Sequence, residues 1–483
     1  MSVEVDADAE TVRGRKYFDP TRLVLALVCA CQFMVILDSS IVNVALPSVQ
    51  RDLGFSATGV AWVVNGYLLA FAGFMLLGGR AADLFGQRRM LIIGLTVFSA
   101  ASLLGGLATT AEPLVAARFA QGVGAALLAP ATLAVINTEF SETRTRARAF
   151  GAWSAAGGIG GMAGALAGGA ITTGLSWRWV FLINVPIGAA LAGLALLSLS
   201  GARSADRESL DLVGAITGTS GLAALIFGVM SSADHGWLSG AVAGPIGLGA
   251  LLLIVFVTVE ARFAARPLVP LRLFRVRPVA VGNTLLLLFG AISIAMWYFT
   301  SLLLQNVLGY SALRTGLGQT PAAVTFLVFA RVSATLLPRT GARLQILAGS
   351  AGLLAGFTWL AYAGADSGYL LGVLGPTLLI AVGIGLTFPT LMALATADAP
   401  DGDAGIVGGL AGTANQIGGA IGLAIFATIA GANAAYGPVF VAAAGTAVVI
   451  AVLAACWIRT RPSGRPSASD RGARTGRWRT TRS

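Results

Sequence analysis

Lysine and histidine are nearly absent from this chain of 483 residues, and each absence excludes a class of function. Lys16 is the only lysine and lies in the N-terminal region, so no phosphate-binding GxxxxGK[ST] loop can be present. ATP hydrolysis by this chain is therefore excluded. His235 is the only histidine, which leaves no Ser/His/Asp arrangement. We expect neither an enzyme nor a metal site, and no cofactor.

Cysteine is scarce too, with three residues in the chain. Cys29, Cys31 and Cys456 all fall in apolar segments, which argues against a disulfide framework or a zinc site. Cys29 and Cys31 are two residues apart and do not face each other on a helix. We interpret all three as small packing residues.

Charged residues make up 11% of the chain, whereas soluble domains carry about 25%. Hydrophobic residues make up 56%, and the mean hydropathy is +0.82. These values predict an all-α integral membrane protein. Segments of the length needed to span a bilayer, about 20 residues each, recur along the chain. We expect fourteen: 23–46, 59–79, 90–110, 113–136, 149–171, 177–199, 211–231, 237–258, 279–305, 315–337, 344–364, 369–395, 404–430 and 434–458.

The net charge of +11 is concentrated in the tails and in every second loop, which is the positive-inside pattern. We therefore expect both termini in the cytoplasm of a multi-pass plasma membrane protein, and no nucleic-acid partner. The loop 396–403 departs from the pattern, because it carries Asp398, Asp401 and Asp403 and no base. The arginines outside the tails and basic loops are Arg51, Arg118, Arg178, Arg314 and Arg331.

The segments divide as six, two and six. Two six-helix bundles in parallel orientation are related by an axis along the membrane normal, and an even insertion preserves that orientation. Glycine-dense fifth segments in both halves, Gly157 to Gly169 and Gly405 to Gly422, support the repeat. The sequence predicts a cytoplasmic tail (1–21) and then a six-helix bundle (22–200), whose first helix acts as an uncleaved signal anchor. Two inserted helices with a basic loop (201–278), a second six-helix bundle (279–458) and a disordered basic tail (459–483) follow.

Asp38 is a lone carboxylate well inside the first apolar segment, roughly 22 Å from its cytoplasmic start at 1.5 Å per residue. A charge there costs about 2.5–3.5 kcal/mol on insertion scales, and such groups mark functional sites. Gln32, Ser39 and Asn43 share one helical face, and Asp38 lies about 100° round from it. A polar face without water must look into the bundle. Because burial disfavours the ionised form, a carboxyl group there is suited to loading and releasing protons.

Seven motifs, spread from about residue 22 to 458, resemble signatures of one family, the fourteen-helix drug/proton antiporters of the major facilitator superfamily. They are LDSSIVNVALP (37–47), GGRAADLFGQRR (78–89), RFAQGVGAAL (118–127), SWRWVFLINVPIG (176–188), RPLVPLRLF (266–274), LQNVLGYSALRTG (304–316) and NQIGGAIG (415–422). The resemblance implies a monomeric transporter that exports amphipathic or cationic drugs or antibiotics. Export would proceed by alternating-access antiport driven by the proton gradient, with no cofactor and no ATP.

The family resemblance implies a role in proton transfer or gating for Arg118, with Gln121 one turn further along the same face. An arginine can stabilise the ionised form of a carboxylate that a conformational change brings close. The alternative is an arginine that snorkels to the cytoplasmic interface. Because Arg118 lies about five residues from the external end of its segment, we favour function.

The resemblance also implies two structural devices. One is a cytoplasmic gating loop, in which Leu84 and Gln87 replace residues that are often basic. The other is an antiporter-motif helix in which Ala165 replaces the family's proline. An alternative stays open for each. The charges of the loop could serve only to set the membrane topology, and the glycines of the helix could serve only for close helix packing. The residues are Gly79, Asp83, Gly86, Arg88 and Arg89 in the loop, and Gly151, Gly160, Gly164, Gly168 and Gly169 in the helix.

The candidate substrate pathway comprises Gln32, Asn43, Gln121, Trp297 and Tyr298. The aromatic pair could stack on a flat apolar or cationic ligand, although packing against lipid or core is the alternative.

Trp62, Trp177 and Trp237 lie near segment ends and are interpreted as interface anchors.

Two other functions remain open at this stage. A proton-coupled importer of a small solute could use Asp38 on the same fold. A membrane sensor is a third class, but no soluble domain supports it. Arginine in place of lysine, with abundant alanine and glycine, suggests a bacterial source with a GC-rich genome, such as an antibiotic producer.

Overall fold

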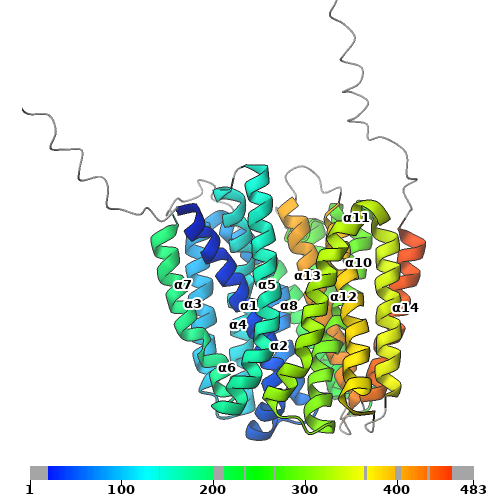
Figure 1. Ribbon diagram of the computed structural model, residues 1–483. Coiled ribbons are helices and arrows are strands. Elements are labelled where there is room, and N and C mark those ends of the chain that lie inside the picture. Colours follow the sequence, from blue (N-terminus) through cyan, green and yellow to red (C-terminus); the bar gives the residue numbers. More distant parts are fainter. Residues whose placement is uncertain are drawn as a thin grey trace, which may run out of the picture.

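The computed structural model describes residues 20–140, 142–199, 211–232, 235–264, 267–363, 367–397, 404–431 and 436–458. Every regular element in this part of the chain is helical (Figure 1), as predicted. In lipid a helix satisfies its backbone hydrogen bonds internally, so long apolar sequences fold this way. Thirteen of the described helices are long and apolar enough to cross a membrane. The predicted N-terminal and C-terminal tails and the acidic residues Asp398, Asp401 and Asp403 lie outside the described residues.

The first part of the chain forms α1 (Pro20–Leu53), α2 (Trp62–Phe85), α3 (Gln87–Gly106), α4 (Ala111–Glu139), α5 (Thr143–Gly174), the short α6 (Arg178–Leu182) and α7 (Asn184–Ser198). The remainder forms α8 (Leu212–Ser231), α9 (Gly240–Thr258), α10 (Arg277–Leu302), α11 (Ala312–Tyr362), α12 (Gly375–Thr396), α13 (Ala404–Ala430) and α14 (Tyr436–Trp457). Short π or 3₁₀ turns follow α9 and α10 and precede α10 and α12, at Val259–Phe263, Leu303–Val307, Leu271–Arg275 and Leu370–Leu374.

The 51-residue α11 folds back on itself. A straight helix of that length would extend about 76 Å, and residues twelve apart would be separated by about 18 Å. Ser333 Oγ nevertheless donates a 2.7 Å hydrogen bond to Gln345 Oε1. The reversal occurs at Gly341, whose φ of +75° is left-handed and suits glycine. The two arms correspond to the predicted segments 315–337 and 344–364, while a topology of fourteen crossings stays a prediction.

Two glycine-rich helices, α5 and α13, stand at the centre of the bundle and join its two parts (Figure 1). A Cβ added at Gly164 of α5 would lie 2.7 Å from the Leu37 carbonyl oxygen of α1, and one at Gly169 would lie 2.6 Å from that of Ala312 in α11. In the same way, Gly422 of α13 abuts Ala291 of α10, and Gly412 abuts Met75 of α2. Each helix therefore packs on the first helix of its own half and on the second helix of the other. This pattern fits the predicted repeat, whose domain boundaries stay a prediction.

The hairpin of α8 and α9 lies against this joint. Thr428 of α13 donates a 3.1 Å hydrogen bond to the Val229 carbonyl of α8, and Gly73 of α2 abuts Thr219 of α8. Gly221 of α8 and Gly249 of α9 allow the two helices to approach closely. The inserted pair thus packs beside the two halves without separating them.

Candidate functional site

The structure brings Asp38 of α1 and Arg118 of α4 into direct contact. Arg118 Nη1 lies 2.6 Å from Asp38 Oδ2, and the two side chains are 1% and 0% exposed. The snorkelling alternative for Arg118 is therefore wrong, because its guanidinium points into the bundle. An ion pair this deeply buried is tolerated only when its remaining donors and acceptors are satisfied.

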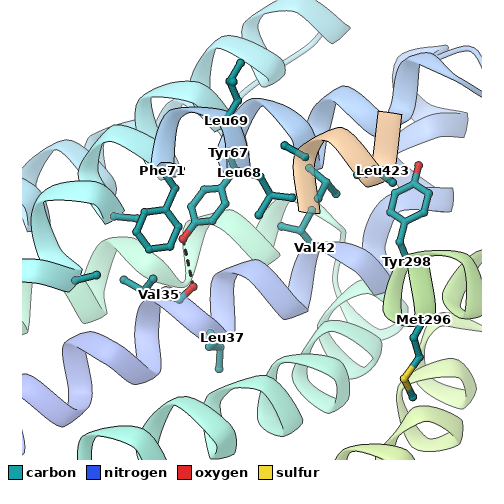
Figure 2. Close-up of a cluster of buried hydrophobic side chains, with 14 of the residues drawn as sticks. Val35, Leu37, Val42, Tyr67, Leu68, Leu69, Phe71, Met296, Tyr298 and Leu423 are labelled. Atoms are coloured by element: carbon teal, nitrogen blue, oxygen red, sulfur yellow. Dashed lines mark hydrogen bonds between the residues drawn. The ribbon is translucent and has the colours of Figure 1, made fainter. Parts of the chain in front are cut away.

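The guanidinium of Arg118 meets that requirement. Its Nε donates to the Val63 carbonyl of α2 at 2.8 Å, and Nη1 also donates to Gln121 Oε1 at 2.9 Å. The Tyr67 and Phe181 rings lie 4.4 and 5.8 Å from its Cζ, close enough for cation–π attraction. The Tyr67 hydroxyl is itself anchored on the Val35 carbonyl of α1 at 3.5 Å (Figure 2).

The carboxylate of Asp38 accepts hydrogen bonds from two amides as well. Gln121 Nε2 donates to Oδ1 at 3.1 Å, and Asn184 Nδ2 of α7 donates to the same oxygen at 2.7 Å. Gln121 Nε2 also donates to Ser102 Oγ of α3 at 2.6 Å. Asp38 thus accepts hydrogen bonds from three side chains, those of Arg118, Gln121 and Asn184. The carboxylate therefore joins α1, α4 and α7 in one buried hydrogen-bonded cluster.

Sequence reasoning identified Asp38, Arg118 and Gln121 but missed Asn184, Ser102 and Tyr67. The available signal was weak. Asn184 is an amide in the apolar segment 177–199, and small polar residues are common in membrane helices. Its role depends on the local fold, because the short helix α6 ends at Leu182 and α7 begins at Asn184, which directs the Asn184 amide toward α1.

The other polar residues predicted on α1 are not part of this cluster. Gln32 lies against α5, where a Cβ added at Gly157 would be 3.1 Å from its Nε2. Asn43 is buried, and its Nδ2 donates to the Ser39 carbonyl on its own helix at 3.4 Å.

The predicted aromatic pair is packed into protein. Tyr298 is 1% exposed and makes an edge-to-face contact with Phe299 at 4.9 Å. Figure 2 shows its side chain beside Leu423, among residues of both halves such as Val42. Trp297 is half-buried, and its carbonyl accepts a hydrogen bond from Gln319. Core packing accounts for Tyr298 in this conformation.

Four of the five predicted antiporter-motif glycines make close helix contacts. Gly160, Gly164 and Gly168 face α1 and Gly169 faces α11, whereas Gly151 has open space around it. Ala165, which replaces the family's proline, is buried with its carbonyl against Gly316 of α11. Alanine keeps α5 regular there, and the contact with the other half is retained.

We expect Gly164→Val to destabilise the protein by about 1–3 kcal/mol, the usual result of overpacking a closed contact. The new Cβ would lie 2.7 Å from both the Leu37 carbonyl oxygen and the Ser40 Cβ. Thermal unfolding in detergent measures the effect. Gly151→Ala is the matched control on the same helix, since its Cβ meets nothing within 4 Å. Equal unfolding temperatures for the two variants would contradict the packing assignment.

The predicted gating loop forms a tight connection between α2 and α3. Gly86 takes a φ of +90°, and Arg88 Nη2 donates to the Leu196 carbonyl in the last turn of α7 at 2.9 Å. Cations stabilise that end of a helix. Gly79 packs near Pro130 of α4, while Asp83 and Arg89 are exposed. The loop thus ties three helix ends together within the first half.

One predicted interface anchor is wrong. Trp177 is 4% exposed because its Nε1 donates to Asp52 Oδ2 at 3.0 Å, and Arg178 pairs with the same oxygen at 2.7 Å. This tryptophan therefore ties α6 to the end of α1. Trp62 is half-buried, and Trp237 is 61% exposed, as an anchor requires.

Residues 28–423 match the sequence pattern of the Major Facilitator Superfamily. The chain is a member of this superfamily. The predicted superfamily is thereby confirmed, and the chain belongs to the transporters, while the fourteen-helix topology stays a prediction. Its fold is similar to that of the solved D-xylose–proton symporter, with a TM-score of 0.65 at 14% identity over 91% of this chain and 98% of that one. At that identity the similarity concerns the fold alone.

Among its superfamily relatives are proteins named for antibiotics. The cephamycin export protein CmcT of Amycolatopsis lactamdurans is 46% identical over 89% of this chain and 91% of its own length. The puromycin resistance protein of Streptomyces alboniger is 40% identical, over 85% and 82%. The tetracenomycin C resistance and export protein of Streptomyces glaucescens is 33% identical, over 87% and 77%. These relatives are all bacterial.

Proposed function

We propose that this protein exports an amphipathic antibiotic or related drug from the bacterial cytoplasm, in exchange for protons. The observation that carries the proposal is the buried Asp38–Arg118 pair. A lone carboxylate that alternates between an ion pair and a neutral acid is a minimal proton carrier. The relatives named for antibiotic export and resistance support the cargo class.

The exchange follows from the contacts of Asp38. In the ionised state Arg118, Gln121 and Asn184 hold the carboxylate, and the cargo enters from the cytoplasm. After reorientation, a proton from outside neutralises Asp38 and releases Arg118 from the pair, which favours discharge of the cargo. Return of the proton to the cytoplasm restores the pair.

We take the structure to be a form that is closed on the external side. The end of α5 meets the start of α11 through a 3.1 Å hydrogen bond from the Leu313 amide to Thr173 Oγ1. With both termini in the cytoplasm, as the arginine distribution favours, these ends are external and closed.

Substrate-induced proton release in proteoliposomes tests the proposal, screened over a small antibiotic panel. We expect release with the parent protein and with Glu112→Gln, which removes an exposed carboxylate from α4. Asp38→Asn should give none. If no antibiotic releases protons, or if Asp38→Asn retains full release, the proposal fails. Everted vesicles decide the direction, because an exporter accumulates cargo in them, whereas the alternative, a proton-coupled importer, depletes it.

A further inference from the structure

The helix that carries Asp38 has a break in its hydrogen bonding near the external end. α1 continues through Pro47 to Leu53. Proline has no N–H, so the carbonyl four residues earlier, that of Asn43, loses its donor within the helix. A buried carbonyl needs a partner, and this one must find it outside α1.

The second half of the protein supplies that partner. Ser301 of α10, which is fully buried, donates through Oγ to the Asn43 carbonyl at 3.0 Å. Gln305 lies one turn further on, and its Nε2 donates to the next carbonyl of α1, that of Val44, at 2.9 Å. The same nitrogen is 3.3 Å from Ser301 Oγ, so the two side chains act together.

The backbone of α10 changes at this contact. A π turn over Leu303–Val307 follows the α-helix and contains Gln305. Such turns insert an extra residue, shift the side chains that follow and are frequent at functional sites. A π turn on one half therefore faces a proline-interrupted helix on the other.

A polar cavity of about 520 Å³ adjoins the contact. Pro47 and Gln305 line it, together with Arg51, Asn306 and Tyr310. A carbonyl freed from Ser301 or Gln305 could therefore be hydrated from this cavity. When the two halves separate at this point, water can replace Ser301 and Gln305 as the partner of the Asn43 and Val44 carbonyls.

We infer that Ser301 and Gln305 form a latch on the Pro47-interrupted segment of α1, which holds the external ends of the two halves closed. The latched carbonyls lie five and six residues beyond Asp38, about 8–9 Å along the same helix. Release of the latch moves the segment that carries the proton site. The inference deepens the proposed function, yet it concerns closure and needs no cargo to be tested.

External labelling of a buried cysteine tests the latch. Leu46, fully buried between the two latched carbonyls and Pro47, is replaced by cysteine in a chain whose Cys29, Cys31 and Cys456 are alanine. Right-side-out vesicles are then treated with a membrane-impermeant maleimide. We expect Ser301→Ala/Gln305→Leu to raise the labelling rate about tenfold, from the loss of two buried hydrogen bonds of ordinary strength.

Thr300→Val is the matched control, because Thr300 is a buried neighbour whose hydroxyl has no partner among the described residues. It should label at the parent rate, and Ser301→Thr, which keeps a hydroxyl, should remain slow. Size-exclusion profiles and unfolding temperatures establish that each variant is folded. An unchanged rate in the folded double variant, or an equal rise in Thr300→Val, would overturn the latch. Proton release by the parent is unaffected by that outcome, so the proposed function would stand.

Discussion

Asparagine at position 38 is expected to reduce substrate-induced proton release to the level of protein-free liposomes. The substitution keeps the size of the side chain and removes the carboxyl group. The other ionisable side chains of the described cluster are Arg118 and Tyr67. Arginine side chains are not deprotonated in proteins. The Tyr67 hydroxyl donates to the Val35 carbonyl. A pH-sensitive dye inside the vesicles measures the release.

Cargo binding is the control for this experiment. Asp38→Asn keeps an oxygen that can accept from Gln121 and Asn184, so the variant should fold and still bind the cargo. Glu112→Gln should behave as the parent. Residual release above about a tenth of the parent rate would mean that another group carries the proton. Loss of binding together with release would instead point to a collapsed fold, which unfolding temperatures reveal.

The second large effect is expected on stability. Arg118→Met should destabilise the protein by about 3–5 kcal/mol, since it leaves the carboxylate of Asp38 buried without its counter-charge. The double variant Asp38→Asn/Arg118→Met should recover much of this loss, because neither charge then remains. Unfolding in detergent, followed for both single variants and the double, measures the coupling.

Recovery in the double variant distinguishes an ion pair from ordinary packing. If the changes in unfolding free energy of the two single variants simply added up in the double variant, the contact between Asp38 and Arg118 would contribute no stability of its own. Gly151→Ala provides a reference for a substitution that touches nothing.

The sequence alone predicts the groups that are costly in a membrane. A carboxylate and a guanidinium in apolar segments stand out in the sequence, which is why Asp38 and Arg118 were recognised as functional candidates. Their direct contact is a finding of the structure. Asn184 and Ser102 were missed because small neutral polar residues are common in membrane helices. Their partners depend on how the helices pack, which the sequence does not show. Trp177 was misassigned for a related reason, since a tryptophan near a segment end looks the same whether it faces lipid or Asp52.

The sequence also does not predict which helices pack against each other. The glycines of 151–169 predict close approach of helices but not which helix approaches, and the structure assigns α1 to one side and α11 to the other. A break between the segments 315–337 and 344–364 is predicted from the sequence, and the structure places the reversal at Gly341 and closes it with the contact between Ser333 and Gln345. The latch likewise depends on two segments more than 250 residues apart, as the separation of 258 between Asn43 and Ser301 shows.

Within the described chain, every hydrogen-bond donor to Asp38 comes from the first 200 residues. The second half therefore senses the charge through the helices of the first half that it touches, which are α1 at the latch, α5 at Gly169 and α2 at Gly412 of α13. Because the second half makes no hydrogen bond to Asp38 within the described chain, its sequence can change without altering the donors to that carboxylate. Selection for a new cargo can reshape α10 to α14 while the charge balance around Asp38 is inherited unchanged.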